Sequence, residues 1–185
     1  METRNQATCV AVCLGLAGLG FGALDVRAEQ DTSAFSRTTI DLGLVVSDLE
    51  ASAAFYGDVL GFEELEGFSV PAQICSDAGL TDDLPLTIRV FALGRGETAT
   101  KLKLMEVAGT EPRRTDNAFI HSQLGFSYLT VYVSDSAAAL ERCARAGVEP
   151  IAKGPVLIGE PPAGPYLSLV RDPDGNLIEL IGAKK

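Results

Sequence analysis

Two glutamates stand in segments whose other residues predict β-strands. Glu106 lies in KLKLMEV and Glu179 lies in NLIELIG. In the first segment, strand alternation places Leu102, Leu104 and Glu106 on one face. A carboxylate on an apolar face is costly unless it is paired, binds a cation or opens onto a wet cavity. We therefore interpret both glutamates as candidates for a functional site, with an acid at the water-accessible rim of a sheet as the alternative for Glu106.

These glutamates belong to an internal repeat. The segment LGLVVSDLEASAAFYGDVLGFEEL, which begins at Leu42, recurs in diverged form as LTVYVSDSAAALERCARAGVEPI, which begins at Leu129, 87 positions later. Two copies of one structural element predict a pseudo-twofold site between them. The repeat pairs four positions with polar side chains: Asp41 with Tyr128, and Glu106 with Glu179.

Each copy predicts a βαβββ module, and together they predict an α+β fold. In the first module, residues 38–109, a strand is followed by a helix that Ser47 and Glu50 cap as a capping box, and Gly61 ends this helix. The segments FEELEGFSV, LTIRVFAL and KLKLMEV predict three further strands, with PAQICSDAGLTDDLP as an insertion. In the second module, residues 125–182, GFSYLTVYV predicts a strand and DSAAALERCARAG a helix. A Gly/Pro-rich loop and a DPDG turn then separate the remaining strands.

The first 28 residues are typical of a secretory signal peptide. Arg4 precedes the apolar stretch CVAVCLGLAGLGFGAL, and a small-residue pattern ends at Ala28. An uncleaved membrane anchor is the alternative, but the apolar stretch is short and rich in glycine. Cleavage would leave a polar lead-in, residues 29–37, and a protein exported to the periplasm or the outside of the cell. Cys75 and Cys143 would then meet conditions that permit a disulfide, although two free buried thiols are the favoured interpretation.

The net charge of −10 argues against nucleic acid as a partner. Phosphate binding requires clustered Lys and Arg, and the basic residues of this chain are scattered. The same argument disfavours a membrane-surface role, so we expect no membrane contact after the signal peptide has been removed. A small molecule is the expected partner.

The chain resembles the vicinal-oxygen-chelate superfamily, which contains glyoxalases, bleomycin-resistance proteins and extradiol dioxygenases. The segments that carry the resemblance are LGLVVSDLEASAAFYGDVLGF and VRDPDGNLIELIG, and the resemblance covers residues 38–182. It implies that the two modules form an open, cup-shaped, mixed eight-stranded sheet around a small-molecule cavity. Two complete modules permit a cup within one chain, and exchange of modules between copies would make a homodimer.

The resemblance also implies a divalent metal. Carried onto this sequence, the four ligand positions of the family fall on Asp41, Glu106, Tyr128 and Glu179. Asp41 and Tyr128 stand where histidine is common in the family. Carboxylate oxygens favour Mg²⁺, Mn²⁺ or Ca²⁺, whereas imidazole suits zinc, so Mn, Mg, Zn or Ca is the implied cofactor. Three carboxylates that converge without a cation would require a raised pKa or a donor partner at one of them.

Two functions of different classes follow from the resemblance. The first is an exported, metal-dependent lyase or isomerase acting on a small oxygenated molecule, in which Glu106 or Glu179 moves a proton and Tyr128 donates a hydrogen bond to the developing enolate. The second is a metal-free small-molecule-binding protein, similar to the bleomycin-resistance members, with an aromatic lining from Tyr128, Tyr132 and Tyr166.

His121 is the only histidine of the chain. It stands seven residues before Tyr128, in the segment that leads into the second module, so it is a candidate auxiliary group for proton transfer or metal ligation. A structural role in a loop is the favoured interpretation, because no nucleophile motif accompanies it.

Overall fold

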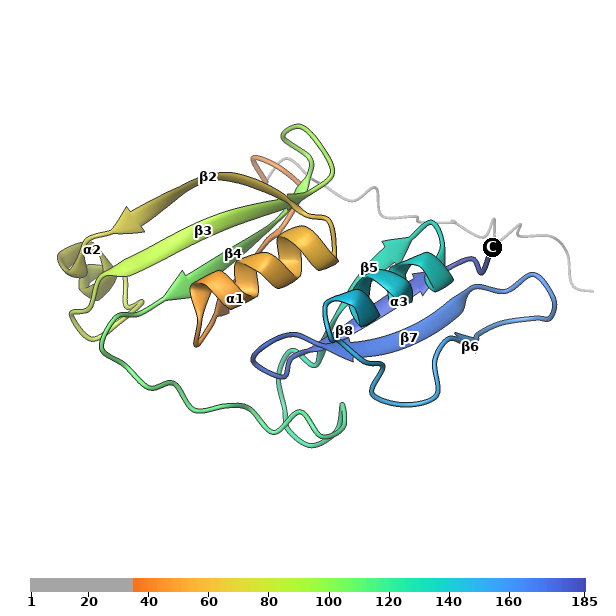
Figure 1. Ribbon diagram of the computed structural model, residues 1–185. Coiled ribbons are helices and arrows are strands. Elements are labelled where there is room, and N and C mark those ends of the chain that lie inside the picture. The colour runs from red at the N-terminus through yellow and green to blue at the C-terminus, as the bar shows by residue number, and fades with distance from the viewer. Residues whose placement is uncertain (1–34) are drawn as a thin grey trace, which may run out of the picture. The chain divides into compact units, whose positions relative to one another are not determined.

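The computed structural model describes residues 35–185. The predicted signal peptide and most of the polar lead-in therefore lie outside the described residues. Residues 37–185 form one compact unit. Within this unit the chain folds into two successive βαβββ modules, and the helix of each module lies across one face of its sheet (Figure 1).

The first module contains a mixed four-stranded sheet with the strand order β1-β4-β3-β2. The terminal strands of the module, β1 and β4, pair in parallel, and the other pairs are antiparallel. The predicted insertion contains a short helix, α2. The elements are β1 (Asp41–Val45), α1 (Leu49–Ala54), its π-helical continuation η1 (Phe55–Val59), β2 (Glu63–Val70), α2 (Ala72–Asp77), β3 (Leu86–Leu93) and β4 (Thr100–Glu106).

The second module repeats this topology with the strand order β5-β8-β7-β6. Its strands β5 and β8 are parallel, as β1 and β4 are in the first module. The predicted α+β architecture of two modules and eight strands is therefore confirmed, as two mixed sheets of four strands each. The elements are β5 (Tyr128–Val133), α3 (Ser136–Arg145), β6 (Val156–Leu157), β7 (Tyr166–Arg171) and β8 (Leu177–Gly182).

The two main helices begin at equivalent aspartates. Asp48 caps α1 by accepting a hydrogen bond from the amide of Ala51 at 2.9 Å, and Asp135 caps α3 by accepting one from the amide of Ala137, also at 2.9 Å. The predicted capping box on Ser47 was therefore wrong by one residue. Ser47 instead donates its amide proton to the side chain of Asp174, 127 positions later in the chain, at 3.0 Å.

Both helical stretches end as the repeat predicts. Gly61 and Gly147 have φ angles of +86° and +74°. A residue with a Cβ atom rarely adopts this left-handed conformation, which explains glycine at both helix ends.

The main hydrophobic core joins the helix-covered faces of the two modules. Tyr56 of η1 is 1% exposed, and its hydroxyl donates a hydrogen bond to Asp172 of the second module at 2.9 Å. Burial, together with the neighbouring Asp172 carboxylate, raises the pKa of the Tyr56 phenol, so the hydroxyl remains a donor. Arg142 of α3 adds a second link, because its Nε donates to the carbonyl oxygen of Val59 at 3.2 Å.

Two features of the described chain bear on the sequence predictions. Cys75 and Cys143 are both buried and free, which confirms the interpretation as thiols. No helix within residues 35–185 is long and apolar enough to span a membrane.

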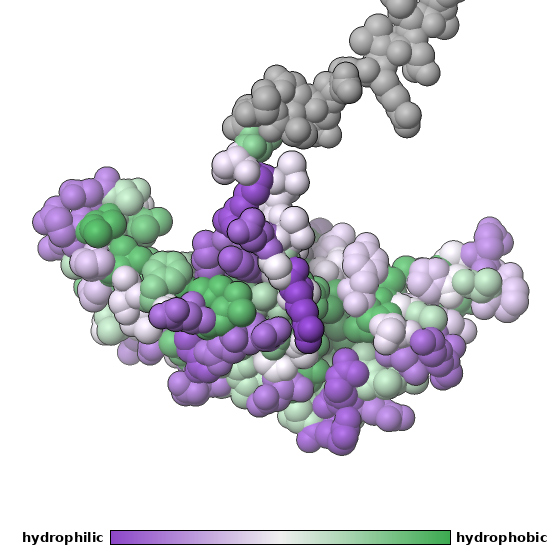
Figure 2. All heavy atoms as spheres, turned by 90° about the horizontal axis from the view of Figure 1, so that it is seen from above, coloured by the Kyte–Doolittle hydropathy of each residue, from purple (hydrophilic) through white to green (hydrophobic). Residues whose placement is uncertain are grey.

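At the end of the molecule that carries α2, hydrophobic residues lie at the surface among hydrophilic ones (Figure 2), and Ile74 and Leu80 there are 55% and 60% exposed.

Candidate functional site

The strand register arranges the first sheet into rows on the face that α1 does not cover, which we call the open face of the first sheet. Residues paired across neighbouring strands point to the same side, so each row runs across the sheet from β1 to β2. One row is charged at both ends, the next has a single charge, and the third is apolar. The rows are Asp41, Lys101, Ala92 and Glu63; Gly43, Lys103, Val90 and Leu65; and Val45, Met105, Ile88 and Phe68.

The register also shows which residue of the first module corresponds to Glu179. In the second module Glu179 pairs with Thr130, two residues after Tyr128. In the first module the residue two positions after Asp41 is Gly43, and Gly43 pairs with Lys103. Lys103, and not Glu106, is therefore the structural equivalent of Glu179, with an offset of 76 positions (179 − 103) instead of the 73 inferred from the sequence.

Lys103 forms an ion pair with Asp41. Its Nζ lies 2.9 Å from Oδ2 of Asp41, and a guanidinium nitrogen of Arg37 lies 3.1 Å from the same oxygen. The hydrogen bond from Lys103 holds the pKa of the Asp41 carboxyl below its ordinary value, and the charge of Arg37 acts in the same direction. The other oxygen of Asp41, Oδ1, is buried and has no hydrogen-bond partner in the protein.

Asp41 and Tyr128, which the repeat equates, line one cavity. Its volume is about 310 Å³, and its lining is mostly apolar. The cavity is lined by residues of β1 and of the beginning of β5, together with Tyr56 of η1 and Asn176, which precedes β8. This size reaches the lower end of the range for small-molecule sites. The structure therefore brings together the first pair of predicted site residues.

The second predicted pair does not meet. Glu106 is exposed at the end of β4, where it pairs with Thr87 on the helix-covered side of the sheet. This position matches the alternative prediction for Glu106, an acid at the water-accessible rim of the sheet. Glu179 lies on the opposite side of its own sheet, half-buried, and accepts a hydrogen bond from the hydroxyl of Thr130 at 2.6 Å.

The three tyrosines of the predicted aromatic lining occupy different places. Tyr128 lines the cavity and is 52% exposed, and Tyr132 follows on the same face of β5, 78% exposed. Tyr166 does not reach this face. It shares the helix-covered side of its sheet with Ser168 and Val170, and Nζ of Lys184 lies 5.7 Å from the centre of its ring.

His121 lies outside the Asp41 cavity. Its ring stacks on Phe119, with 5.6 Å between the ring centres and an angle of 14° between the planes. Both residues line a second, mostly apolar cavity of about 390 Å³ against β7. The auxiliary role of His121 stays a prediction, and the structure supplies a packing role for the side chain.

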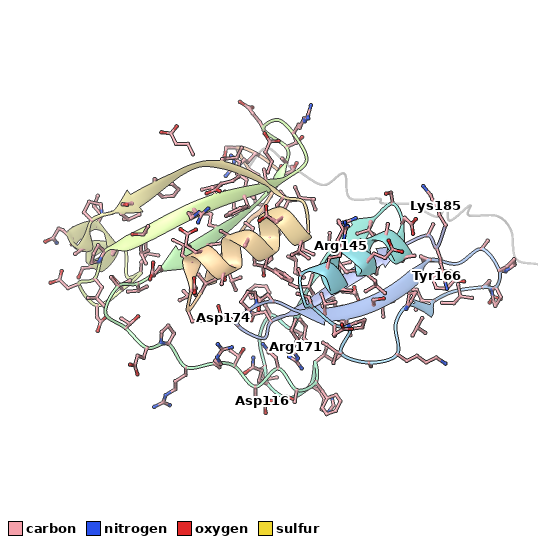
Figure 3. The ribbon with its side chains drawn as sticks, in the orientation of Figure 1. Asp116, Arg145, Tyr166, Arg171, Asp174 and Lys185 are labelled. Atoms are coloured by element: carbon pink, nitrogen blue, oxygen red, sulfur yellow. The ribbon has the colours of Figure 1, made fainter. Side chains whose placement is uncertain are left out.

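The linker between the modules is fixed to the DPDG turn, which places the beginning of β5. Arg171 donates hydrogen bonds to the carbonyl oxygens of Gly175 and Asn117, both at 2.8 Å. Figure 3 shows Arg171 and Asp174 above the part of the linker that carries Asp116. Arg114 adds an ion pair with Asp174 at 3.6 Å.

Comparisons with known proteins agree with this topology. A family model, the Glyoxalase/Bleomycin resistance protein/Dioxygenase superfamily, matches residues 38–180. The chain belongs to this superfamily. A comparison with curated protein sequences finds no match.

Several solved structures have the glyoxalase fold of this chain. A glyoxalase family protein from Bacillus cereus has a TM-score of 0.65 at 17% identity, over 80% of this chain and 96% of that chain. A trypanothione-dependent glyoxalase I from Leishmania major has a TM-score of 0.52 at 22% identity, over 80% and 87% of the two chains. Glyoxalase I from Zea mays has a TM-score of 0.56 at 21% identity, over 80% of this chain and 45% of that chain. At these identities the likeness shows the fold.

Proteins of this superfamily often bind a divalent metal, which requires several donor side chains close together. Within residues 35–185 no group of three or more His, Cys, Asp or Glu side chains lies close enough together to hold a metal ion. At the position equivalent to Glu179, the first module presents the ammonium group of Lys103, which already occupies Oδ2 of Asp41. A divalent cation at Asp41 would have to displace the ammonium group of Lys103 and lie near the guanidinium group of Arg37. The residues present therefore do not fit a divalent metal at Asp41.

The sequence reasoning missed Lys103 and Arg37. A signal for Lys103 was present, because the polar residue lies between two leucines in LKLM as Glu179 lies between Ile and Leu in LIEL. Aligning the strands by these central positions would have equated the two residues. No comparable signal marks Arg37, which lies outside the repeat.

Proposed function

We propose that this chain is an exported superfamily member that binds a small molecule at the Asp41–Tyr128 cavity without a divalent metal. One observation carries the proposal, namely the ion pair between Lys103 and Asp41 at 2.9 Å. In this arrangement a protein cation supplies the charge that a metal would otherwise supply to the carboxylate. Asp41 is thereby stabilised in its ionised form without an external ion.

The cavity supports binding by its composition. Its apolar wall offers contact area, and the exposed ring of Tyr128 at its edge offers a flat surface with a polar end. Asp41 adds an ionised carboxylate to the residues that line the cavity. A few placed polar groups in an apolar cavity are typical of small-molecule sites.

The metal-dependent lyase or isomerase has less support. That mechanism needs carboxylates from both modules around one cation. Glu106, the metal ligand that the sequence predicted from the first module, lies at the rim of the sheet on the helix-covered side. Lys103 occupies the position equivalent to Glu179. Proton transfer by Glu179 with assistance from Tyr128 stays a prediction.

The proposal is tested by thermal unfolding of the full chain in the presence of a library of small organic molecules, with and without EDTA. We expect compounds that raise the melting temperature equally in both conditions and that are recovered chemically unchanged after incubation. A requirement for added metal would overturn metal-free binding, and recovery of a converted compound would overturn a function in binding alone.

Export and a homodimer belong to the same proposal. The signal-peptide pattern of residues 1–28 supports export, and detection of a mature protein that begins at Glu29 in the periplasm or medium would test it. Exposed apolar side chains on the open face of the first sheet support a homodimer, since Val45, Leu65 and Phe68 are 44%, 37% and 48% exposed.

A further inference from the structure

The second cavity, against β7, is a place of its own in the second module. Its volume of about 390 Å³ falls in the range of small-molecule sites. The linker segment 118–121, the residues 151–154 that precede β6, and side chains of β6, β7 and β8 line it. Asp41 and Tyr128 do not line it, and it shares only Leu177 with the Asp41 cavity.

Hydrogen bonds fix both loops that line this cavity. In the linker, the amide of Phe119 donates to the hydroxyl of Ser122, and the amide of Ser122 donates to the carbonyl oxygen of Phe119, both at 3.0 Å. In the other loop, the amide of Ile151 donates to the carbonyl oxygen of Leu169 in β7 at 2.8 Å. Walls that are fixed before binding cost a ligand less ordering entropy.

The apolar side chains that these loops contribute are exposed. Phe119 is 68% exposed, and Ile120, Ile151 and Val156 are exposed as well. The ring of Phe119 also stacks on that of His121 in the same lining. A ligand with an apolar body would remove this surface from water, which favours binding, and an aromatic body suits an aromatic lining.

The ionisable side chains of the lining are both basic. Lys153 and His121 line the cavity, whereas none of its described lining residues is Asp or Glu, although the chain has 25 acidic residues. Both side chains are exposed, and within residues 35–185 neither forms an ion pair. Lys153 therefore offers one permanent positive charge, and His121 offers a ring N–H donor. One such charge suits a ligand with one anionic group.

We propose that this cavity is a second ligand site, which binds a small aromatic monocarboxylate. The aromatic body would lie against Phe119 and the apolar loop side chains, and the carboxylate would bind Lys153, with a further hydrogen bond from His121. Charge-assisted hydrogen bonds of this kind are stronger than neutral ones. The site is additional to the proposed Asp41–Tyr128 site and does not depend on it.

His121 supplies a reporter for this cavity, because it is the only histidine of the chain. Its ring protons are followed by proton NMR in the full chain without a purification tag, at constant pH. The probes are 2-naphthoate and its neutral counterpart 2-naphthamide, and calorimetry gives their affinities. We expect the naphthoate to shift the His121 signals saturably and to bind about tenfold more tightly than the amide. Equal affinities, or naphthoate binding that leaves the His121 signals unmoved, would overturn the inference, as would a failure of the naphthoate to bind.

Variants separate the charge from the aromatic contact. Lys153→Met should remove about tenfold of the naphthoate affinity and leave the naphthamide unchanged, whereas Lys153→Arg should retain most of the preference. Phe119→Ala should weaken both probes by a similar factor, and unchanged affinities would contradict the proposed contact.

Lys101→Met is the matched control, because Lys101 lies in the first module and does not line this cavity. It should weaken naphthoate binding by less than about threefold. An equal loss in Lys101→Met and Lys153→Met would show general attraction and overturn the inference. Asp41→Ala should leave naphthoate binding unchanged. A loss in Asp41→Ala but not in Lys153→Met would assign the ligand to the Asp41 cavity, which would overturn this inference and support the proposed function.

Discussion

The hydrogen bond between the Tyr56 hydroxyl and Asp172 is the clearest single link between the two modules, and its removal has a calculable effect. Asp172 accepts four hydrogen bonds on its two oxygens, as an ionised carboxyl can: from the Asp174 amide at 3.0 Å, the Asn176 amide at 2.7 Å, the Asn176 side chain at 2.9 Å and Tyr56 at 2.9 Å. Tyr56→Phe removes one bond and leaves three.

A hydrogen bond to a charged group is worth about 1.5–3 kcal/mol, and we expect the lower part of this range because Asp172 keeps three donors. The free energy of unfolding should therefore fall by about 1.5–2 kcal/mol. For a domain of this size this corresponds to a melting temperature lower by about 3–8 °C. The assay is equilibrium unfolding in urea, followed by far-ultraviolet circular dichroism, with an unchanged m-value as the sign that both states remain comparable.

Tyr132→Phe is the control, since Tyr132 is 78% exposed. This change should alter the free energy of unfolding by less than about 0.5 kcal/mol. The reasoning is refuted if Tyr56→Phe destabilises the protein no more than Tyr132→Phe does.

Three further predictions follow from the same contacts. The pKa of Asp41 is lowered in the folded state, so its ion pair stabilises the fold above the ordinary Asp pKa of about 3.9, and this contribution is lost as the pH falls through the lowered pKa. Lys103→Met should therefore shift acid unfolding, followed by circular dichroism, to higher pH, and an unchanged midpoint would count against the pair. Gly67→Ala should lower the free energy of unfolding by about 1–3 kcal/mol in urea titrations, because its Cβ would lie 2.4 Å from the Ile88 carbonyl oxygen; a neutral result would contradict the close approach. Light scattering after size-exclusion chromatography should give twice the mass of one chain for wild-type protein and a lower mass for Phe68→Glu, whereas a monomer at all concentrations would reject the homodimer.

Sequence reasoning predicted the modules because their signals are local and duplicated. Apolar periodicity identified β1, the strands β3, β4 and β8, and the helical stretches α1–η1 and α3, and the glycines at the helix ends identified where these two stretches stop. The short helix α2 lies in the segment that was predicted only as an insertion. The cap of α1 was misplaced by one residue because both Ser47 and Asp48 are suitable cap residues. Which of the two caps the helix depends on Asp174, whose side chain accepts a hydrogen bond from the amide of Ser47 and which lies 127 positions away.

The site was harder to predict, because it too depends on contacts between residues that are far apart in the sequence. The pairing of Asp41 with Tyr128 follows directly from the repeat, and both residues line one cavity. The equivalence of Lys103 with Glu179 depends on the register between β4 and β1, which the different lengths of the two modules conceal. The ion pair of Asp41 with Arg37 and Lys103 is a three-dimensional contact that no spacing rule indicates.

The most direct test of metal-free binding is isothermal titration of Mn²⁺, and separately Zn²⁺, into full-length protein that has been stripped with a chelator. Lys103→Glu, which places a carboxylate at the position equivalent to Glu179, and Asp41→Ala are measured beside it. We expect wild-type protein to show no saturable binding up to about 1 mM metal and Lys103→Glu to gain affinity. Stoichiometric binding to wild-type protein that Asp41→Ala abolishes would contradict the proposed metal-free site.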